Sequence, residues 1–132
     1  MVFGTFWFLF AAFLAANFVD YITGWMKARY TKTENSNKGL KGIIKKVGYW
    51  IVIAIAFFIS YGFTEFGEII GINLGFTALI GWFVLGTFTI NEIRSILENL
   101  VLIGVEVPIF LIKGLEVAND KINNAVNGGG EK

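Results

Sequence analysis

The groups in this chain that could do chemistry are carboxylates and amines. Its 132 residues include 11 Lys and Arg and 10 Asp and Glu, but no His and no Cys. This composition excludes disulfides, zinc sites built on Cys or His, and catalytic triads or proton relays that use His. The carboxylates do not form a pair typical of an acid–base site. The sequence therefore predicts no enzyme and no catalytic, cofactor-binding or metal-binding residue, and the net charge of +1 gives no preference for nucleic acid.

Asp20 is the first charged residue of the chain. It lies in the stretch NFVDYITGWMKARY, residues 17–30, which follows residues 1–16, where no charge occurs. The order is apolar run, Asp, Thr-Gly and then basic residues. A helix that leaves a membrane has this order, whereas a helix in a soluble core has no need of it.

Three apolar stretches could position the charged residues. They cover about residues 2–19, 47–63 and 69–90. A helix needs roughly 20 residues to cross a hydrocarbon core of ~30 Å, and in lipid it must satisfy its own backbone. Only 16% of the residues are charged, against about 25% in soluble domains. We therefore expect a single-domain, all-α integral membrane protein with three transmembrane helices.

The basic residues predict the orientation of these helices. They lie between residues 27 and 46 or after the third stretch, while the link at 64–68 carries two Glu and no basic residue. Because basic loops stay in the cytoplasm, we expect the N-terminus outside, the basic loop inside, the acidic hairpin outside and the C-terminus inside.

Two other interpretations are weaker. The first stretch could be a cleaved signal peptide, since AAFLAAN offers small residues, but it lacks a basic n-region and basic residues follow it directly. The second and third stretches could form a buried soluble hairpin. A domain of 132 residues, however, has too little volume to hide three such helices from water.

This topology brings charged residues from three helix ends to one depth. An Asp ends the first span, two Lys precede the second, and Asn-Glu follows the third. A carboxylate near the interface needs a partner or water, because a charge held deeper costs at least ~2.5 kcal/mol. We expect an ionic collar in which Asp20 and Glu92 pair with a lysine, unless each charge only marks a helix end. The predicted members are Asp20, Lys41, Lys45, Lys46, Asn91 and Glu92.

The remaining segments suggest amphipathic structure. Residues 39–46 either lie on the inner leaflet or form a charge run that sets the topology. Residues 93–101 place apolar side chains on one helix face, so the third helix continues inward or bends onto the membrane. Pro108 then starts a new segment. We expect amphipathic cytoplasmic helices over about 91–126 and a flexible tail at 127–132. Apolar residues of the last helix recur at helical spacing, which suits self-association or docking on the membrane: Leu111, Leu115, Ala118, Ile122 and Ala125.

Small residues at four-residue spacing predict close helix packing within or between subunits. They occur in the first span and at the entrance of the third: Ala11, Ala12, Ala15, Ala16, Gly67, Gly71 and Gly75.

Four motifs in this order resemble the phage-lysis and toxin-secretion holin family: DYITG, GLKGIIKK, NEIRSILEN and VPIFL. The similarity covers roughly residues 18–117. Its signature positions are Asp20, Thr23, Gly24, Gly39, Leu40, Lys41, Gly42, Lys45, Lys46, Asn91, Glu92, Ser95, Glu98, Asn99 and Pro108.

The resemblance implies a multi-pass protein of the bacterial cytoplasmic membrane without a cofactor. Such a protein assembles into homo-oligomers in the lipid and opens a pore or lesion for an endolysin or a large toxin. A large lesion needs a wettable wall, and the candidates for lining it are Asn17, Asn73, Thr77, Thr87 and Thr89. The alternative is a membrane scaffolding or regulatory subunit without pore activity, which would bind a larger complex through residues 92–126.

Overall fold

The computed structural model describes the backbone of residues 2–127 and the side chains of residues 7–125. This part of the chain consists of helices joined by short links, without a strand. Its elements are α1 (Val2–Thr31), α2 (Ser36–Ile70), the short 3-10 helix η1 (Gly75–Thr77), α3 (Ala78–Leu102) and α4 (Ile109–Asn127). Of the predicted tail at 127–132, Asn127 ends α4 and the rest lies outside the described residues.

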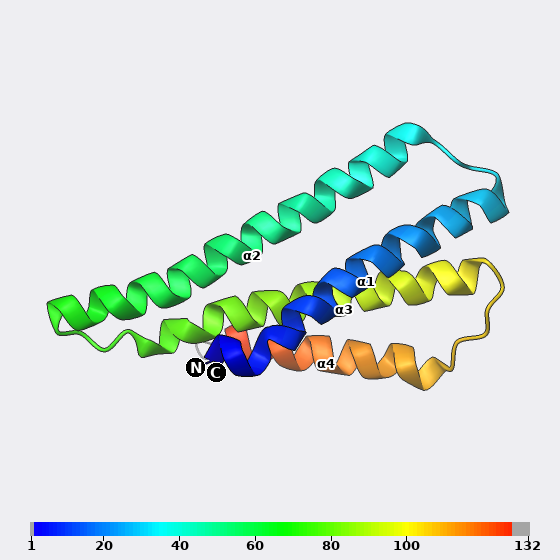
Figure 1. Cartoon of the computed structure of the whole chain (residues 1–132). Helices are drawn as coiled ribbons and strands as arrows, with labels where there is room; N and C mark the ends of the chain where they lie inside the picture. The colour runs from blue at the N-terminus through cyan, green and yellow to red at the C-terminus, as the bar shows by residue number, and fades with distance from the viewer. Residues whose placement is uncertain (1, 128–132) are drawn as a thin grey trace.

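The long helices α1, α2 and α3 form an elongated antiparallel bundle (Figure 1). Both α1 and α2 pack on α3, and α4 turns back and runs alongside α3 (Figure 1). All three long helices are long and apolar enough to cross a membrane. The prediction of an all-helical protein with three membrane-spanning helices is therefore confirmed.

Local capping sets the two ends of α2. The side chain of Asn35 accepts a hydrogen bond from the backbone N–H of Asn37 at 2.8 Å, as an N-cap residue does. At the other end Gly71 has φ 79°, a left-handed conformation that favours glycine. The Ile72 N–H then donates to the Gly67 carbonyl at 2.8 Å. A Cβ at Gly67 would lie 2.5 Å from the Ile72 oxygen, so the turn needs glycine there as well.

The helix ends differ from the predicted boundaries. Residues 64–68 were expected to form a hairpin, but they are helical, and the chain reverses only after Ile70. The three glycines at 67, 71 and 75 therefore lie in α2, at its C-cap and in η1, and share no helix face. This prediction of a glycine packing face was wrong, because Gly71 ends a helix.

The helices also extend farther on the opposite side of the bundle. Most of the predicted basic loop at 27–46 is helical, and only the short link before Ser36 separates α1 from α2. Helix α3 is continuous to Leu102, beyond the predicted end of the third span.

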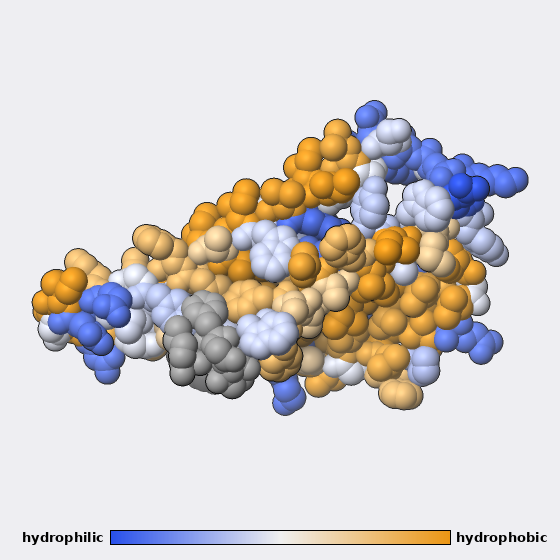
Figure 2. All heavy atoms as spheres, viewed as in Figure 1, coloured by the Kyte–Doolittle hydropathy of each residue, from blue (hydrophilic) through white to orange (hydrophobic). Residues whose placement is uncertain are grey.

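The apolar core is small and lies where the three long helices meet. Phe13, Ile53, Phe57 and Leu85 form its centre. The Phe57 ring meets Trp82 edge-on, with 4.9 Å between ring centroids. Most other large apolar side chains of these helices are exposed, and they cover the visible face of the bundle (Figure 2). A surface of this kind suits lipid rather than water.

Candidate functional site

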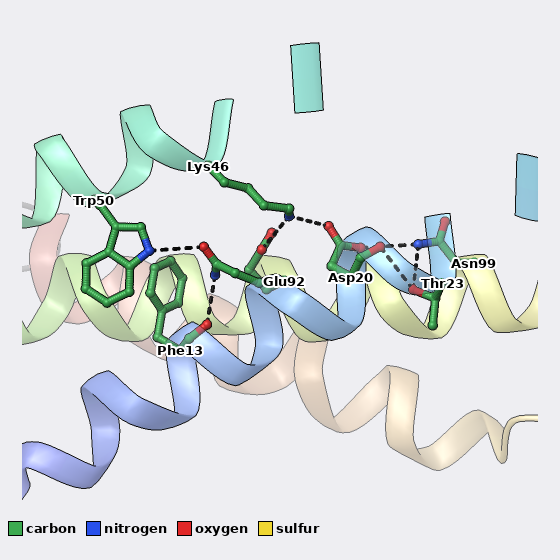
Figure 3. Close-up of polar contacts among 8 residues, drawn as sticks. Phe13, Asp20, Thr23, Lys46, Trp50, Glu92 and Asn99 are labelled. Carbon is green, nitrogen blue, oxygen red and sulfur yellow. Dashed lines mark hydrogen bonds and ion pairs between the residues drawn. The ribbon is translucent and has the colours of Figure 1, made fainter. Parts of the chain in front are cut away.

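The ammonium group of Lys46 joins the three long helices. Its Nζ donates to Asp20 Oδ2 of α1 at 2.7 Å and to Glu92 Oε2 of α3 at 2.6 Å (Figure 3). The side chains of Lys46, Asp20 and Glu92 are 16%, 13% and 4% exposed. The structure thus brings together three members of the predicted ionic collar, one from each helix.

Two neutral residues extend this arrangement. Asn99 Nδ2 donates to Asp20 Oδ1 at 3.2 Å and to Thr23 Oγ1 at 3.0 Å. The Thr23 hydroxyl in turn donates to the Asp20 backbone oxygen at 3.2 Å. We call Asp20, Thr23, Lys46, Glu92 and Asn99 the interhelical polar cluster.

The interhelical polar cluster contains two carboxylates and one ammonium group, so it carries one more negative than positive formal charge. The extra negative charge lies on groups that Asn99 and Lys46 stabilise with hydrogen bonds. A buried ion pair contributes modestly to net stability, but removing one partner costs about 3–5 kcal/mol. The cluster therefore fixes the three helices at one depth rather than offering a reactive group.

Near this cluster, helix α3 buries two of its polar side chains and exposes some of its apolar ones. Glu92 and Asn99 are 3% and 6% exposed, while Ile93 and Val101 are 36% and 47% exposed. A soluble amphipathic helix would have the opposite arrangement. Polar side chains of membrane helices face the protein interior, because lipid offers them no hydrogen-bond partner.

Asn17 makes a second polar link between α1 and α2. Its Nδ2 donates to the Phe13 backbone oxygen at 2.8 Å, and its Oδ1 accepts from Trp50 Nε1 at 3.2 Å (Figure 3). Asn17 is only 6% exposed. Both polar atoms of its side chain therefore have partners inside the protomer, and its place in the wall of a lesion stays a prediction.

A third polar link ties α2 to the start of α3. Ser60 Oγ accepts from the Gly81 N–H at 2.9 Å, and the Thr77 hydroxyl donates to the Ser60 backbone oxygen at 3.2 Å. Gly81 lies in the first turn of α3, so this bond holds the start of that helix against α2. Sequence reasoning missed both Ser60 and Gly81, since a single Ser or Gly carries no periodic signal.

The other residues predicted to line a water-filled lesion differ from one another in their exposure. Asn73 lies exposed in the turn after α2, outside the spans, and its Oδ1 accepts from the Gly75 N–H at 3.0 Å. Thr77 is buried. Thr87 and Thr89 are half-buried in α3, and the Thr89 hydroxyl donates to the Leu85 oxygen at 2.7 Å.

The remaining signature positions lie around the interhelical polar cluster without joining it. Lys41, Lys45 and Glu98 are exposed, and Asn91 is half-buried beside Glu92. Gly24 is half-buried, and a Cβ there would lie 3.7 Å from Asn99 Nδ2. Pro108 is exposed directly before α4.

The predicted alanine face of α1 points mostly away from the bundle. Ala11, Ala12 and Ala15 are exposed, and Ala16 is half-buried. The inward side of α1 instead carries Phe13 and larger polar residues. Alanine therefore does not provide the contact of α1 with α3, and these side chains remain available on the outer surface.

An open cleft of about 1000 Å³ lies between α1 and the first part of α2. Members of the interhelical polar cluster form its inner wall. Its other walls carry lysines and aromatic residues of both helices: Tyr21, Trp25, Lys27, Lys38, Lys45 and Tyr49.

Comparison with known proteins identifies the family. Residues 1–120 match the model of the bacteriophage holin family. An uncharacterized protein of Clostridium perfringens is 35% identical over 106 residues, which cover 80% of this chain and 71% of that protein. A second C. perfringens relative, a 14.9 kDa protein in the nagH 3′ region, is 35% identical over 79% of this chain and 71% of its own length.

A relative from Halalkalibacterium halodurans is 36% identical over 68% of this chain and 62% of its own length. No solved structure gives a significant match. With three helices long and apolar enough to cross a membrane, the chain is a multi-pass protein of the cytoplasmic membrane, and it belongs to the bacteriophage holin family.

Proposed function

We propose that the protein assembles into homo-oligomers in the cytoplasmic membrane and opens a lesion through which an endolysin or a large toxin crosses. The proposal rests on one observation: polar side chains of the spans are buried and form hydrogen bonds within the protomer. Asn17, Ser60 and Thr77 are buried and hydrogen-bonded inside the protomer. A water-filled opening would therefore form between protomers, and it would require association. The holin family, a family of non-enzymatic membrane proteins, fits this role.

The exposed alanines of α1 support association. Ala11, Ala12 and Ala15 form a short exposed patch of small side chains on this helix, between the larger exposed residues Phe8 and Val19. Small residues let helix backbones approach closely in lipid, where packing replaces the hydrophobic driving force. A neighbouring protomer would use this surface.

The proposed orientation places the link between α1 and α2 in the cytoplasm. Lys and Arg are frequent around this link, whereas the far end of α2 carries Glu65 and Glu68 without a basic residue. Positive residues remain on the cytoplasmic side during insertion. The N-terminus would then lie outside, and the interhelical polar cluster would lie at the cytoplasmic end of the spans.

Timed induction in a bacterium tests the function directly. Membrane potential, turbidity and release of a cytosolic reporter enzyme are recorded with and without a co-expressed endolysin. Sudden lysis that requires endolysin, together with release of the reporter after wall removal, is the expected result. Depolarisation without reporter release would contradict a large lesion and indicate a small pore.

The scaffolding alternative would use the apolar residues of the segment 92–126 for a partner. Ile112, Leu115 and Ile122 are half-buried where α4 packs on α3, so a partner would have to bind the exposed ones, such as Phe110 and Val117. Stable association with another protein, without any change of membrane potential, would favour that alternative.

A further inference from the structure

Helix α4 extends alongside the membrane-spanning part of α3. The Cδ1 atom of Ile122 lies 3.8 Å from where a Cβ at Gly86 would be. Gly86 is on the apolar side of Glu92, about 9 Å along the helix axis at 1.5 Å per residue. Figure 1 shows α4 running back along α3. Because Gly86 is next to Leu85 of the apolar core, the second half of α4 reaches past the interhelical polar cluster to the depth of that core.

The two sides of α4 differ in polarity. The half-buried side consists of Ile112, Leu115, Asn119 and Ile122. The exposed side is mainly polar from residue 113 onward, and it also includes Val117 and three small residues. Its charged and amide side chains are Lys113, Glu116, Asp120, Lys121, Asn123 and Asn124. On the three long helices the exposed side chains are mainly apolar. Thus α4 presents a polar surface at a depth where the rest of the protomer presents an apolar one.

This polar surface cannot face hydrocarbon at low cost. Asp120 lies within one turn of Ile122, which contacts the middle of α3. A charged side chain held in lipid is costly unless it faces a partner or a water-filled cavity. No ion pair involves Asp120 or Lys113 among the described residues. The arrangement is therefore compatible with the membrane only if water reaches this side of α4.

We propose that the second half of α4, residues 117–125, forms part of the wall of the aqueous lesion, with Asp120 and Asn123 toward water. The inference rests on the proposed function, because it assigns the wettable surface of that lesion. It would explain how spans that bury their own polar side chains enclose water. The half-buried side of α4 would stay on α3, and the long helices would keep their apolar surfaces toward lipid.

Paired labels at nearly equal depth test this proposal. The chain contains no Cys, so Asn123→Cys and Ala125→Cys each provide a single site for an environment-sensitive fluorophore. Both positions are exposed in the protomer, but they lie about 160° apart around α4 at 100° per residue. The full chain is reconstituted in vesicles of bacterial phospholipid, and a trapped dye reports permeabilisation of the same vesicles.

The expected result is several-fold stronger quenching by aqueous iodide at position 123 than at position 125 in vesicles that release dye. Equal iodide quenching at both positions, without quenching by lipids labelled in mid-chain, would place α4 outside the bilayer and overturn the proposal. Weak iodide quenching at both positions would mean a dry inserted helix and would also overturn it.

The dye separates this inference from the proposed function. Vesicles that retain dye with correctly inserted protein would contradict lesion formation itself. Vesicles that release dye without the difference between positions 123 and 125 would contradict only the role of α4.

Discussion

Lys46 of α2 and Glu92 of α3 form an ion pair with 2.6 Å between Nζ and Oε2, although the Glu92 side chain is only 4% exposed. The same ammonium also binds Asp20 of α1. One cation therefore holds carboxylates from two other helices, and no second ion pair in the described residues duplicates this function.

Replacing Lys46 by Met should destabilise the protomer by about 3–5 kcal/mol, because it leaves two buried carboxylates without a cation. Unfolding by SDS in mixed micelles measures the effect. Lys45→Met is the matched control, since Lys45 is exposed and makes no ion pair in the described residues. Equal stability of both variants would show that the contacts of Lys46 add nothing to folding. Adding Glu92→Gln to Lys46→Met should restore part of the loss.

Gly81→Ala should destabilise the bundle by about 1–3 kcal/mol, as overpacking of a core does. A Cβ at this position would lie 2.6 Å from the Phe57 ring. The control is Gly62→Ala in α2, where no atom lies within 4 Å of the new Cβ. That change should leave stability equal or raise it by about 0.5–1 kcal/mol, because Ala favours helix. The same SDS titration compares the two variants. An unfolding midpoint of Gly81→Ala equal to that of the unchanged protein would contradict the close packing of Gly81 against Phe57.

Asn17→Leu should cost about 1–3 kcal/mol, since it removes a buried amide that is the acceptor of the half-buried Trp50 indole N–H. Asn73→Leu removes an exposed turn contact and should cost about 0.5 kcal/mol. Trp fluorescence during unfolding reports both variants. Asn17→Leu should lower the free energy of unfolding more than Asn73→Leu does. If Asn73→Leu instead abolished permeabilisation at unchanged stability, the wall of the lesion would include the turn after α2.

Ala15→Phe should impair oligomer formation without changing the stability of the protomer. Its side chain is exposed on α1, so the larger ring points away from the other helices of its own protomer but blocks close approach of a neighbour. Chemical crosslinking in membranes and lysis timing measure the result. Ala54→Phe, at an exposed position of α2, is the matched control and should assemble normally. Impairment by both substitutions to the same degree would argue against the alanine surface of α1.

Asn119→Leu should strengthen the packing of α4 on α3. The Oδ1 atom of Asn119 is buried and has no hydrogen-bond partner among the described residues, and such an atom costs about 1–3 kcal/mol. Hydrogen exchange of α4 amides should slow in this variant. Asn123→Leu, on the exposed side, should leave the exchange unchanged. Faster exchange after Asn119→Leu would mean that the amide has a partner in the assembled protein.

Sequence reasoning could predict the three spans, because each apolar stretch is as long as a membrane crossing requires. It could not place the reversal after α2. Gly67, Gly71 and Gly75 are all possible helix ends, and the polar residues at 64–68 suggested an earlier turn. Helix α2 ends at Gly71 because, of these three glycines, only Gly71 has a left-handed backbone conformation. The Ile72 N–H then donates a hydrogen bond to the Gly67 carbonyl. Such contacts do not show in composition.

The sequence also predicts that the charged residues at the helix ends lie at one depth in the membrane. It predicts only part of their ion-pair and hydrogen-bond partners. Asp20 and Glu92 could be placed opposite three lysines, and helical phase distinguishes among these. Lys46 shares one face of α2 with the inward-facing Trp50 and Ile53, at spacings of four and three residues. Lys45 points elsewhere. The contact between Asn99 and Asp20 joins residues 79 positions apart, so it depends on how α1 and α3 pack together.

Helix α2 is unbroken over 35 residues, and Lys46 lies much closer to its start than to its end. At 1.5 Å per residue, about 15 Å of rigid rod lies on one side of Lys46 and about 36 Å on the other. The ion pairs thus hold α2 off-centre. The longer arm toward Ile70 is fastened separately, by the hydrogen bond between Ser60 and Gly81 and by the apolar core, so a rigid α2 needs both attachments to keep its position on α3.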